Sequence, residues 1–284
     1  MSNKKKKTTN KKNTLQNKPI KKESSKKVVK ENKKIVKENK NLKKLFNILI
    51  IVLVIVIITS TILLISKKKE EKETFTEVKE STIPYIEEET KEISIEDEIK
   101  ELKNSYNNND IIGIISIKGG DLNTPVVQTK DNQYYLKYSL TKKRSIIGAV
   151  FMDYRVNSNS KQINIYGHNS TKYKPPFQKL EKYLEKSYYK DHNILELKVN
   201  NEKKLYEIFS IVIADKVGTE EHMNIKYKTD KEYYNHFKRL KNRSLYDTGV
   251  NIEESDNVLV LQTCIYGKYK GKLLVIVAKK VKEN

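Results

Sequence analysis

The sequence predicts a mainly β domain, a closed barrel or a sandwich with peripheral helices, preceded by one transmembrane helix. Two observations lead to this fold class. An uncharged apolar segment occupies positions 45–66, and from about Ile93 the chain alternates turn signals with about eight short runs rich in Ile, Val, Leu and Tyr. The stretch from Ile93 to Asn284 is long enough to bury a substantial core as one domain.

The first 44 residues are strongly basic. They hold 18 lysines and three glutamates, and so carry most of the formal charge of +21 of this 284-residue chain. Such a segment, with almost no aromatic side chains, cannot bury enough apolar surface to fold alone, so we expect residues 1–44 to be a disordered cytoplasmic tail. A nucleic-acid-binding tail would have a similar composition, but no binding motif accompanies the charge, and no nucleic-acid partner is expected.

The apolar segment at 45–66 reads LFNILIIVLVIVIITSTILLIS. It is long enough to cross the hydrocarbon core of a bilayer, it exceeds the apolar region of a cleaved signal peptide, and no small-residue cleavage site follows it. We therefore expect an uncleaved, single-pass anchor in the cell membrane. The lysine excess before it predicts a cytoplasmic N-terminus, with lysines near anionic lipid head groups, and an extracellular C-terminal domain.

Residues 67–92, rich in Glu, Lys and Thr, read as an extracellular linker to a domain at 93–284. The first element of this domain is an amphipathic helix that begins after Ser94, has acidic residues in its first turn and ends at Asn107. Two more helices are expected, at 177–184 and, after a Thr229 cap, at 230–241. The expected strands are 111–117, 125–128, 146–152, 163–166, 194–199, 204–214, 258–263 and 273–281.

Cys264 is the only cysteine of the chain, so it has no intramolecular disulfide partner and is either a buried filler or a reactive thiol. His168 follows a β run at a glycine-containing strand exit, which is a favourable place for a catalytic group. The other histidines, His192, His222 and His236, are adequately explained as solvated surface residues. A thiol beside His168 would make a nucleophile and acid/base pair.

Other chemistries find little support in the sequence. One cysteine and dispersed histidines lack the ligand spacing of a zinc site, and no Asp-rich loop matches a calcium motif. Serine catalysis lacks its Gly-x-Ser-x-Gly element. We therefore expect no metal.

Several short segments, taken together and in order, resemble a class B sortase. They are GIISI at 113–117, PVVQ at 125–128, DNQYYL at 131–136, GAVFMDYR at 148–155, IYGHN at 165–169 and LQTC at 261–264. The similarity spans about Ile93 to Val281. Sortases are membrane-anchored cysteine transpeptidases of Gram-positive bacteria, so the resemblance implies an eight-stranded β-barrel, a role in anchoring surface proteins to the cell wall, and no cofactor.

The resemblance assigns the nucleophile to Cys264 and the acid/base to His168. The family's third residue is an arginine on the strand after the cysteine, but no arginine follows Cys264 here. Lys272 stands just before the last expected strand, where the arginine would be. Lys272 is therefore either an oxyanion cation without the planar fork of a guanidinium, or a solvated strand-end lysine.

By the same resemblance, the Cys264 thiolate would attack the threonine carbonyl of a C-terminal sorting motif, and the thioacyl-enzyme would pass the surface protein to a peptidoglycan precursor amine. Two alternatives stay open: a pilin-polymerising sortase, and a non-catalytic surface-binding protein on a sortase fold. The sorting motif itself is not predicted. Met223, Ile225 and Tyr227 lie in the region that shapes the substrate groove in relatives, and they either contact the peptide or pack on the barrel.

Overall fold

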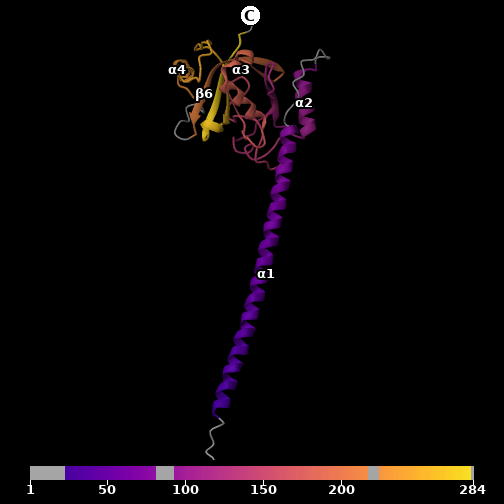
Figure 1. Cartoon of the computed structure of the whole chain (residues 1–284). Coiled ribbons are helices and arrows are strands. Elements are labelled where there is room, and N and C mark those ends of the chain that lie inside the picture. Colours follow the sequence, from indigo (N-terminus) through magenta and orange to yellow (C-terminus); the bar gives the residue numbers. More distant parts are fainter. Residues whose placement is uncertain (1–22, 81–92, 217–223, 283–284) are drawn as a thin grey trace, which may run out of the picture. The chain divides into compact units, whose positions relative to one another are not determined.

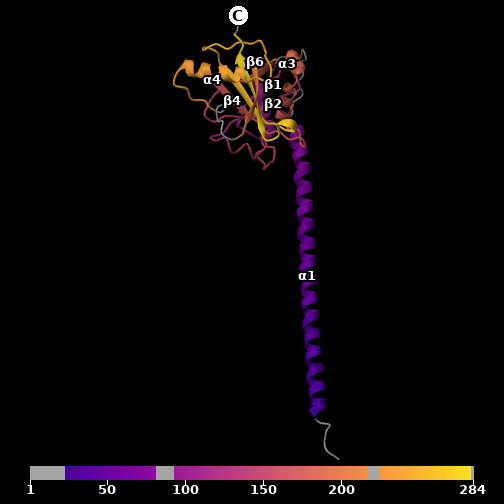
Figure 2. The same ribbon diagram turned by 60° about the vertical axis from the view of Figure 1, so that its left-hand side comes forward.

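The computed structural model describes residues 23–80, 93–216 and 224–282. The chain divides into two compact units, Met1–Lys67 and Lys68–Asn284, which are considered separately below. The first unit is helical in its described part, and the second contains a β-barrel with helices on its surface (Figures 1 and 2).

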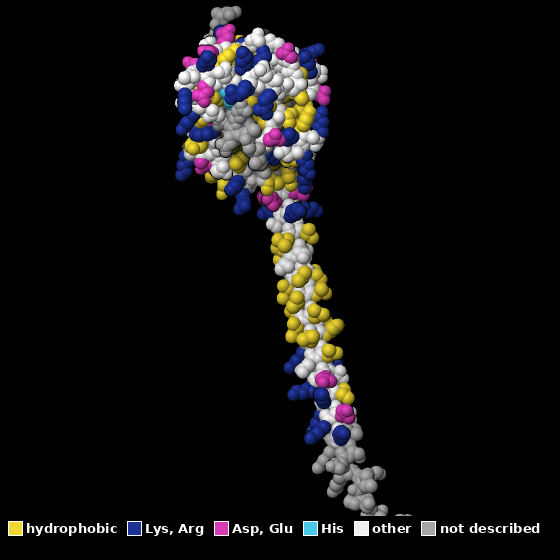
Figure 3. All heavy atoms as spheres, turned by 90° about the vertical axis from the view of Figure 1, so that its left-hand side faces the viewer, with side chains coloured by type: hydrophobic (Ala, Val, Ile, Leu, Met, Phe, Trp, Pro, Cys, Tyr) yellow, Lys and Arg dark blue, Asp and Glu magenta, His cyan; other side chains and the backbone are white. Residues whose placement is uncertain are grey.

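Helix α1 runs from Glu23 to Glu80. Figure 3 shows a belt of hydrophobic side chains along it, with basic side chains at both ends of the belt. Its stretch Val29–Val78 contains a window of mean hydropathy 3.4, and no residue of this window is buried against other parts of the protein. Helix α1 is therefore long and apolar enough to cross a membrane.

The helix extends beyond the apolar segment in both directions, and on the N-terminal side this differs from the expectation of a disordered tail. Residues 23–44 and 67–80 are helical. Lysine and glutamate are good helix formers, and a chain that continues an existing helix does not need a new nucleus. Residues 68–80 group with the second unit, where Glu71 forms an ion pair with Lys172 (2.8 Å) and Phe75 packs edge-on against Tyr173.

The second unit is a closed eight-stranded barrel, which confirms the predicted fold class. Its strands follow the order β1-β2-β3-β4-β7-β8-β6-β5. All neighbouring pairs are antiparallel except β2–β3 and β4–β7, which are parallel. The strands are β1 (Ile111–Ile117), β2 (Asn123–Val127), β3 (Phe151–Met152), β4 (Gln162–Tyr166), β5 (Ile194–Val199), β6 (Glu202–Asp215), β7 (Val258–Cys264) and β8 (Lys272–Lys280).

The helices of this unit lie outside the barrel (Figures 1 and 2). They are α2 (Ile95–Tyr106), the 3₁₀ helix η1 (Pro176–Leu184), α3 (Lys186–Asp191), α4 (Asp230–Asn242) and the 3₁₀ turn η3 (Gly267–Tyr269). Both predicted caps are confirmed. The backbone N–H of Asp97 donates to Ser94 Oγ (3.1 Å), and that of Glu232 donates to Thr229 Oγ1 (3.1 Å).

Side chains alternate between two faces along the strands that carry the site. Ile163 and Ile165 of β4 join the main core, as do Leu259 and Leu261 of β7. On the other face of β7, Val258 and Val260 pack with α4 side chains in a second cluster, which Cys264 also joins. This alternation decides which residues of neighbouring strands can meet.

Two local expectations differ from the structure. The strand expected at 146–152 is reduced to Phe151–Met152, because Gly148 has a φ of 57° and the preceding backbone bonds to a loop instead of a strand: the N–H of Ala149 donates to the Tyr135 carbonyl. Helix α3 (Lys186–Asp191) was not expected. Its six residues are too few to show a clear helical period in sequence.

Candidate active site

Cys264 is the last residue of β7, between β4 on one side and β8 on the other. It is half-buried. Its side chain lies on the same face of β7 as Val258, Val260 and Gln262, since residues two apart share a face. Directly across from it on β8 is Leu273, which is 9% exposed. The thiol therefore stands at a strand end, on the outer face of the barrel.

His168 follows β4 by two residues, and the parallel pairing of β4 with β7 brings it beside Cys264. The ladder pairs Tyr166 with Gln262, and the Gly167 N–H then donates to the Gln262 carbonyl (3.2 Å). Extending this register by two residues places His168 next to Cys264 on the same face. The ladder itself ends at Tyr166 and Gln262, and its direction leads to the residues predicted as acid/base and nucleophile.

The imidazole of His168 is held by a backbone carbonyl. His168 Nε2 lies 2.9 Å from the Leu136 carbonyl oxygen, an arrangement in which a protonated Nε2 donates to that oxygen. Among the residues that the structure describes, no hydrogen bond joins this ring to the Cys264 thiol. In free enzymes such a contact is often long, and it tightens when substrate binds.

Two glycines allow close packing around His168. A Cβ on Gly148 would lie 2.1 Å from the Tyr135 carbonyl oxygen and 3.2 Å from His168 Cδ2. A Cβ on Gly167, the residue before His168, would lie 2.7 Å from the ring of Phe177. Both positions therefore need the absence of a side chain.

Lys272 is the first residue of β8, and it faces away from Cys264. Because Leu273 lies directly opposite Cys264, the preceding residue Lys272 points to the other face of the sheet. There its ammonium lies 2.8 Å from Asp215 Oδ1 of β6, and this hydrogen bond lowers the pKa of Asp215. The geometry favours the second of the two interpretations of Lys272, a half-exposed strand-end lysine in an ion pair.

The two other described histidines, His192 and His236, have their contacts elsewhere. His192 stacks on Tyr188 and bonds to the Tyr188 and Gly119 carbonyls. His236 was expected to be solvated, but it is only 2% exposed, because α4 turns this position toward Tyr227 and Phe237. His222 lies outside the described residues. Within the described parts of the chain, no group of three His, Cys, Asp or Glu side chains is arranged to hold a metal ion.

A buried ion pair of Asp153 with Arg155 contacts Tyr166, the last residue of β4, and the sequence analysis did not single it out. Asp153 is fully buried and accepts two hydrogen bonds from the Arg155 guanidinium (2.9 and 2.6 Å) and one from the Tyr166 hydroxyl (2.9 Å). Burial opposes ionisation of Asp153, but these donors outweigh it, so its pKa is lowered. Burial also raises the pKa of Tyr166. The pattern Asp-x-Arg was visible in sequence, but its burial was not.

A second group that the sequence analysis did not single out joins the segment of His168 to the segment of Cys264 by hydrogen bonds. Asn169, directly after His168, donates from Nδ2 to the Cys264 carbonyl (2.8 Å) and to Glu181 Oε1 of η1 (2.7 Å). The same carboxylate oxygen accepts the Tyr266 N–H (3.2 Å). No sequence signal distinguishes Glu181 from the other surface glutamates.

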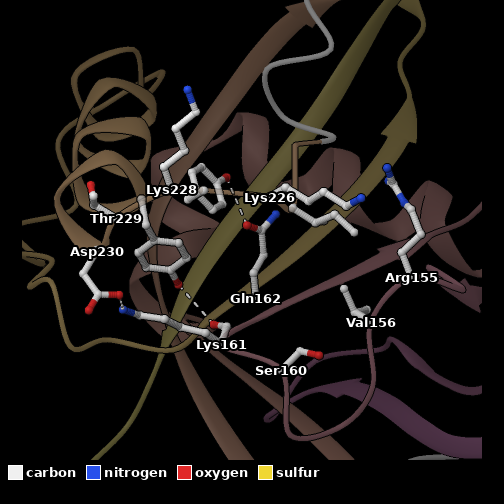
Figure 4. Close-up of a pocket in the computed structure, with 12 residues that line it drawn as sticks. Arg155, Val156, Ser160, Lys161, Gln162, Lys226, Lys228, Thr229 and Asp230 are labelled. Carbon is white, nitrogen blue, oxygen red and sulfur yellow. Dashed lines mark hydrogen bonds and ion pairs between the residues drawn. The ribbon is translucent and has the colours of Figure 1, made fainter.

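A cavity of about 480 Å³ lies at the opposite ends of the same two strands. Figure 4 shows Gln162 at its centre, with Arg155 and Lys226 on one side and the ion pair of Lys161 with Asp230 on the other. Gln162 pairs with Val258, six positions before Cys264, so the cavity is about 20 Å from the thiol.

The connection before α4 forms one wall of this cavity. Ile225 and Tyr227, two of the residues expected in the substrate region, line it, and the Tyr227 hydroxyl donates to Gln162 Oε1 (3.1 Å). Met223 lies outside the described residues. The structure therefore places this connection along β4, at the far end from the reactive pair.

The closed eight-stranded barrel matches solved structures of sortases, which are cysteine transpeptidases. The comparisons narrow this class. Sortase B of Staphylococcus aureus is 33% identical over 181 residues, which cover 62% of this chain and 72% of that protein. The chain belongs to the sortase B family.

Solved structures agree with this assignment, although no family model matches the chain. A crystal structure of sortase B complexed with triglycine is 27% identical to this chain, with a TM-score of 0.60. The match covers 67% of this chain and 88% of the chain in that structure. The Staphylococcus aureus sortase B–substrate complex is 25% identical with a TM-score of 0.59, and it covers 77% of this chain and 94% of that one.

Proposed function

We propose that this protein cleaves a C-terminal sorting motif after threonine and joins the released surface protein to a cell-wall amine. The observation that supports the proposal is the parallel β4–β7 register in a sortase B barrel, which, continued by two residues past Tyr166 and Gln262, leads to His168 and Cys264. The substrate and triglycine complexes of related sortases support the two halves of the reaction, in which a substrate and then a glycine amine are bound.

In the first half-reaction, the Cys264 thiolate attacks the threonine carbonyl and forms a tetrahedral intermediate. His168, as imidazolium, gives its proton to the departing amine when the peptide bond breaks, and a thioester on Cys264 remains. In the second half-reaction, the incoming amine attacks the thioester, its proton returns to His168, and the thiolate leaves. One amide is broken and one is formed, so no cofactor or oxidant is needed.

The site would operate outside the cell. In this proposal α1 is the anchor, and its lysine-rich end stays in the cytoplasm because positive residues are retained on that side. The barrel is then extracellular, where sorting-signal proteins and peptidoglycan precursors are available.

The experiment uses the full-length chain in detergent micelles and a library of sorting-motif peptides, with triglycine as the amine. We expect cleavage and ligation by the unmodified protein, a thioacyl adduct on Cys264 by mass spectrometry, no turnover by Cys264→Ala, and a loss of about 10²-fold to 10⁴-fold with His168→Ala. His192→Gln serves as the matched control, because His192 is also a half-exposed histidine held by backbone carbonyls. Unchanged turnover in Cys264→Ala would end the proposal.

A further inference from the structure

The segments that carry Cys264 and His168 are joined beyond the end of their β ladder by side chains. The last ladder pair is Tyr166 with Gln262. Past it, Thr263 Oγ1 donates to the Gly167 carbonyl (2.8 Å), Asn169 Nδ2 donates to the Cys264 carbonyl (2.8 Å), and the Tyr266 hydroxyl donates to the Asn169 carbonyl (3.2 Å). These bonds replace the ladder where the two reactive side chains stand.

We propose that Asn169 is a positioning residue, which fixes the Cys264 backbone against the segment of His168 and so sets the distance between thiol and imidazole. The inference rests on the proposed function, because it requires that these two side chains act as a pair. Asn169 is 5% exposed and touches the backbone of the nucleophile itself.

The polarity of the contacts determines how the Asn169 amide is oriented. Glu181 Oε1 and the Cys264 carbonyl are both acceptors, so only the Nδ2 end of the amide can face them. Glu181 in turn accepts the Tyr266 N–H, and it therefore ties Asn169 to the chain after Cys264 as well. Asn169 thus contacts the nucleophile itself through its NH₂ group, and the chain two residues later through its carboxylate partner.

The Cys264 backbone depends on Asn169 because strand β7 ends at Cys264. On the β8 side, the ladder continues through the Ile265 N–H, which donates to the Lys272 carbonyl (3.2 Å). On the β4 side, Asn169 donates to the Cys264 carbonyl. Without Asn169, this carbonyl loses a buried donor, and the strand end is free to shift relative to His168. A displacement of about 1 Å between reacting groups can reduce a rate by about 10²-fold.

The test is a double-mutant cycle on the full-length chain in detergent, read by the rate of Cys264 alkylation with iodoacetamide from about pH 5 to about pH 10, a range that spans the ordinary pKa values of imidazole and thiol. This readout needs no sorting motif. The four proteins are the unmodified chain, Asn169→Ala, His168→Ala and the double variant. If Asn169 acts through the pair, Asn169→Ala alters the rate about tenfold and changes the pH profile when His168 is present, but has no further effect once His168 is removed.

Three further variants separate positioning from folding. Glu181→Gln keeps an acceptor oxygen for Asn169 and Tyr266, so we expect it to retain the pH profile, whereas Glu181→Ala loses the contact and follows Asn169→Ala. Ser210→Ala is the matched control, because it removes another buried hydrogen bond, to the Leu240 carbonyl, away from the site. It should lower thermal stability and leave the alkylation profile unchanged.

The outcomes are distinct. Equal effects of Asn169→Ala with and without His168, or a profile that superimposes on that of the unmodified chain, would overturn the positioning role while leaving the proposed function intact. A His168→Ala profile identical to the unmodified one would show that the thiol and imidazole do not act as a pair, and would overturn the proposed mechanism and the positioning role together.

Discussion

Gly148 gives a direct test of how tightly the barrel encloses His168. The backbone at Gly148 has a φ of 57°, a left-handed conformation that disfavours a Cβ by about 1–2 kcal/mol. Its Cβ would also lie 2.1 Å from the Tyr135 carbonyl oxygen, and relieving such overpacking costs about 1–3 kcal/mol. Gly148→Ala should therefore lose about 2–5 kcal/mol of folding free energy.

For a domain of this size, such a loss lowers the melting temperature by about 10 °C. Thermal unfolding followed by near-ultraviolet circular dichroism of the tyrosines measures it. Because the same Cβ would lie 3.2 Å from His168 Cδ2, the variant should also lose cleavage activity at temperatures where it is still folded.

Gly249 provides the matched control. Its φ of 75° is also left-handed, but a Cβ there would meet no atom within 4 Å. Gly249→Ala should show the backbone penalty alone, a drop of about 4 °C, with full activity. Equal melting temperatures for the two variants would refute the steric reasoning, and full activity of a folded Gly148→Ala would refute the link to His168.

Two further predictions concern charged groups near the site. Lys272→Ala should keep kcat within about tenfold and match Asp215→Asn, since the ammonium pairs with Asp215 on the other face; a loss of about 10²-fold to 10³-fold in peptide cleavage would instead assign Lys272 to the oxyanion. Asp153→Asn should cost about 3–5 kcal/mol near neutral pH. The folded pKa of Asp153 lies below its unfolded value of about 3.9, so this stabilisation is present above about pH 4 and is lost as the pH falls through the folded pKa. Melting temperatures of both proteins, measured from about pH 7 down to about pH 2, should converge at the acid end, and a constant difference would contradict the ion-pair explanation.

Local signals predicted most elements well. Ser94 and Thr229 cap α2 and α4 as expected, because capping depends on residues three positions apart and is written in the sequence. The alternating runs of β5 and β7 were found almost to the residue. The strand near Gly148 was overestimated, since its apolar residues pack under a loop that only the tertiary structure supplies.

The reactive residues were only partly predictable. Cys264 stood out because it is the only cysteine, and His168 because it leaves a strand beside a glycine. Asn169 and Glu181 carry no such mark, since a single hydrogen bond between distant segments leaves no periodic pattern. The sequence also did not predict on which face of β8 Lys272 lies, because a shift of one residue in the ladder moves every side chain of the strand to the opposite face.

Composition and short-range periodicity were enough to predict the apolar helix, the β character of the domain and the lone thiol. Which strands are neighbours depends on the tertiary structure. The parallel pairing of β4 with β7 leads toward His168 and Cys264, and the antiparallel pairing with β8 turns Lys272 to the other face. These registers are set by packing over the whole barrel, where one residue of slippage would expose a buried face, and local sequence does not record them.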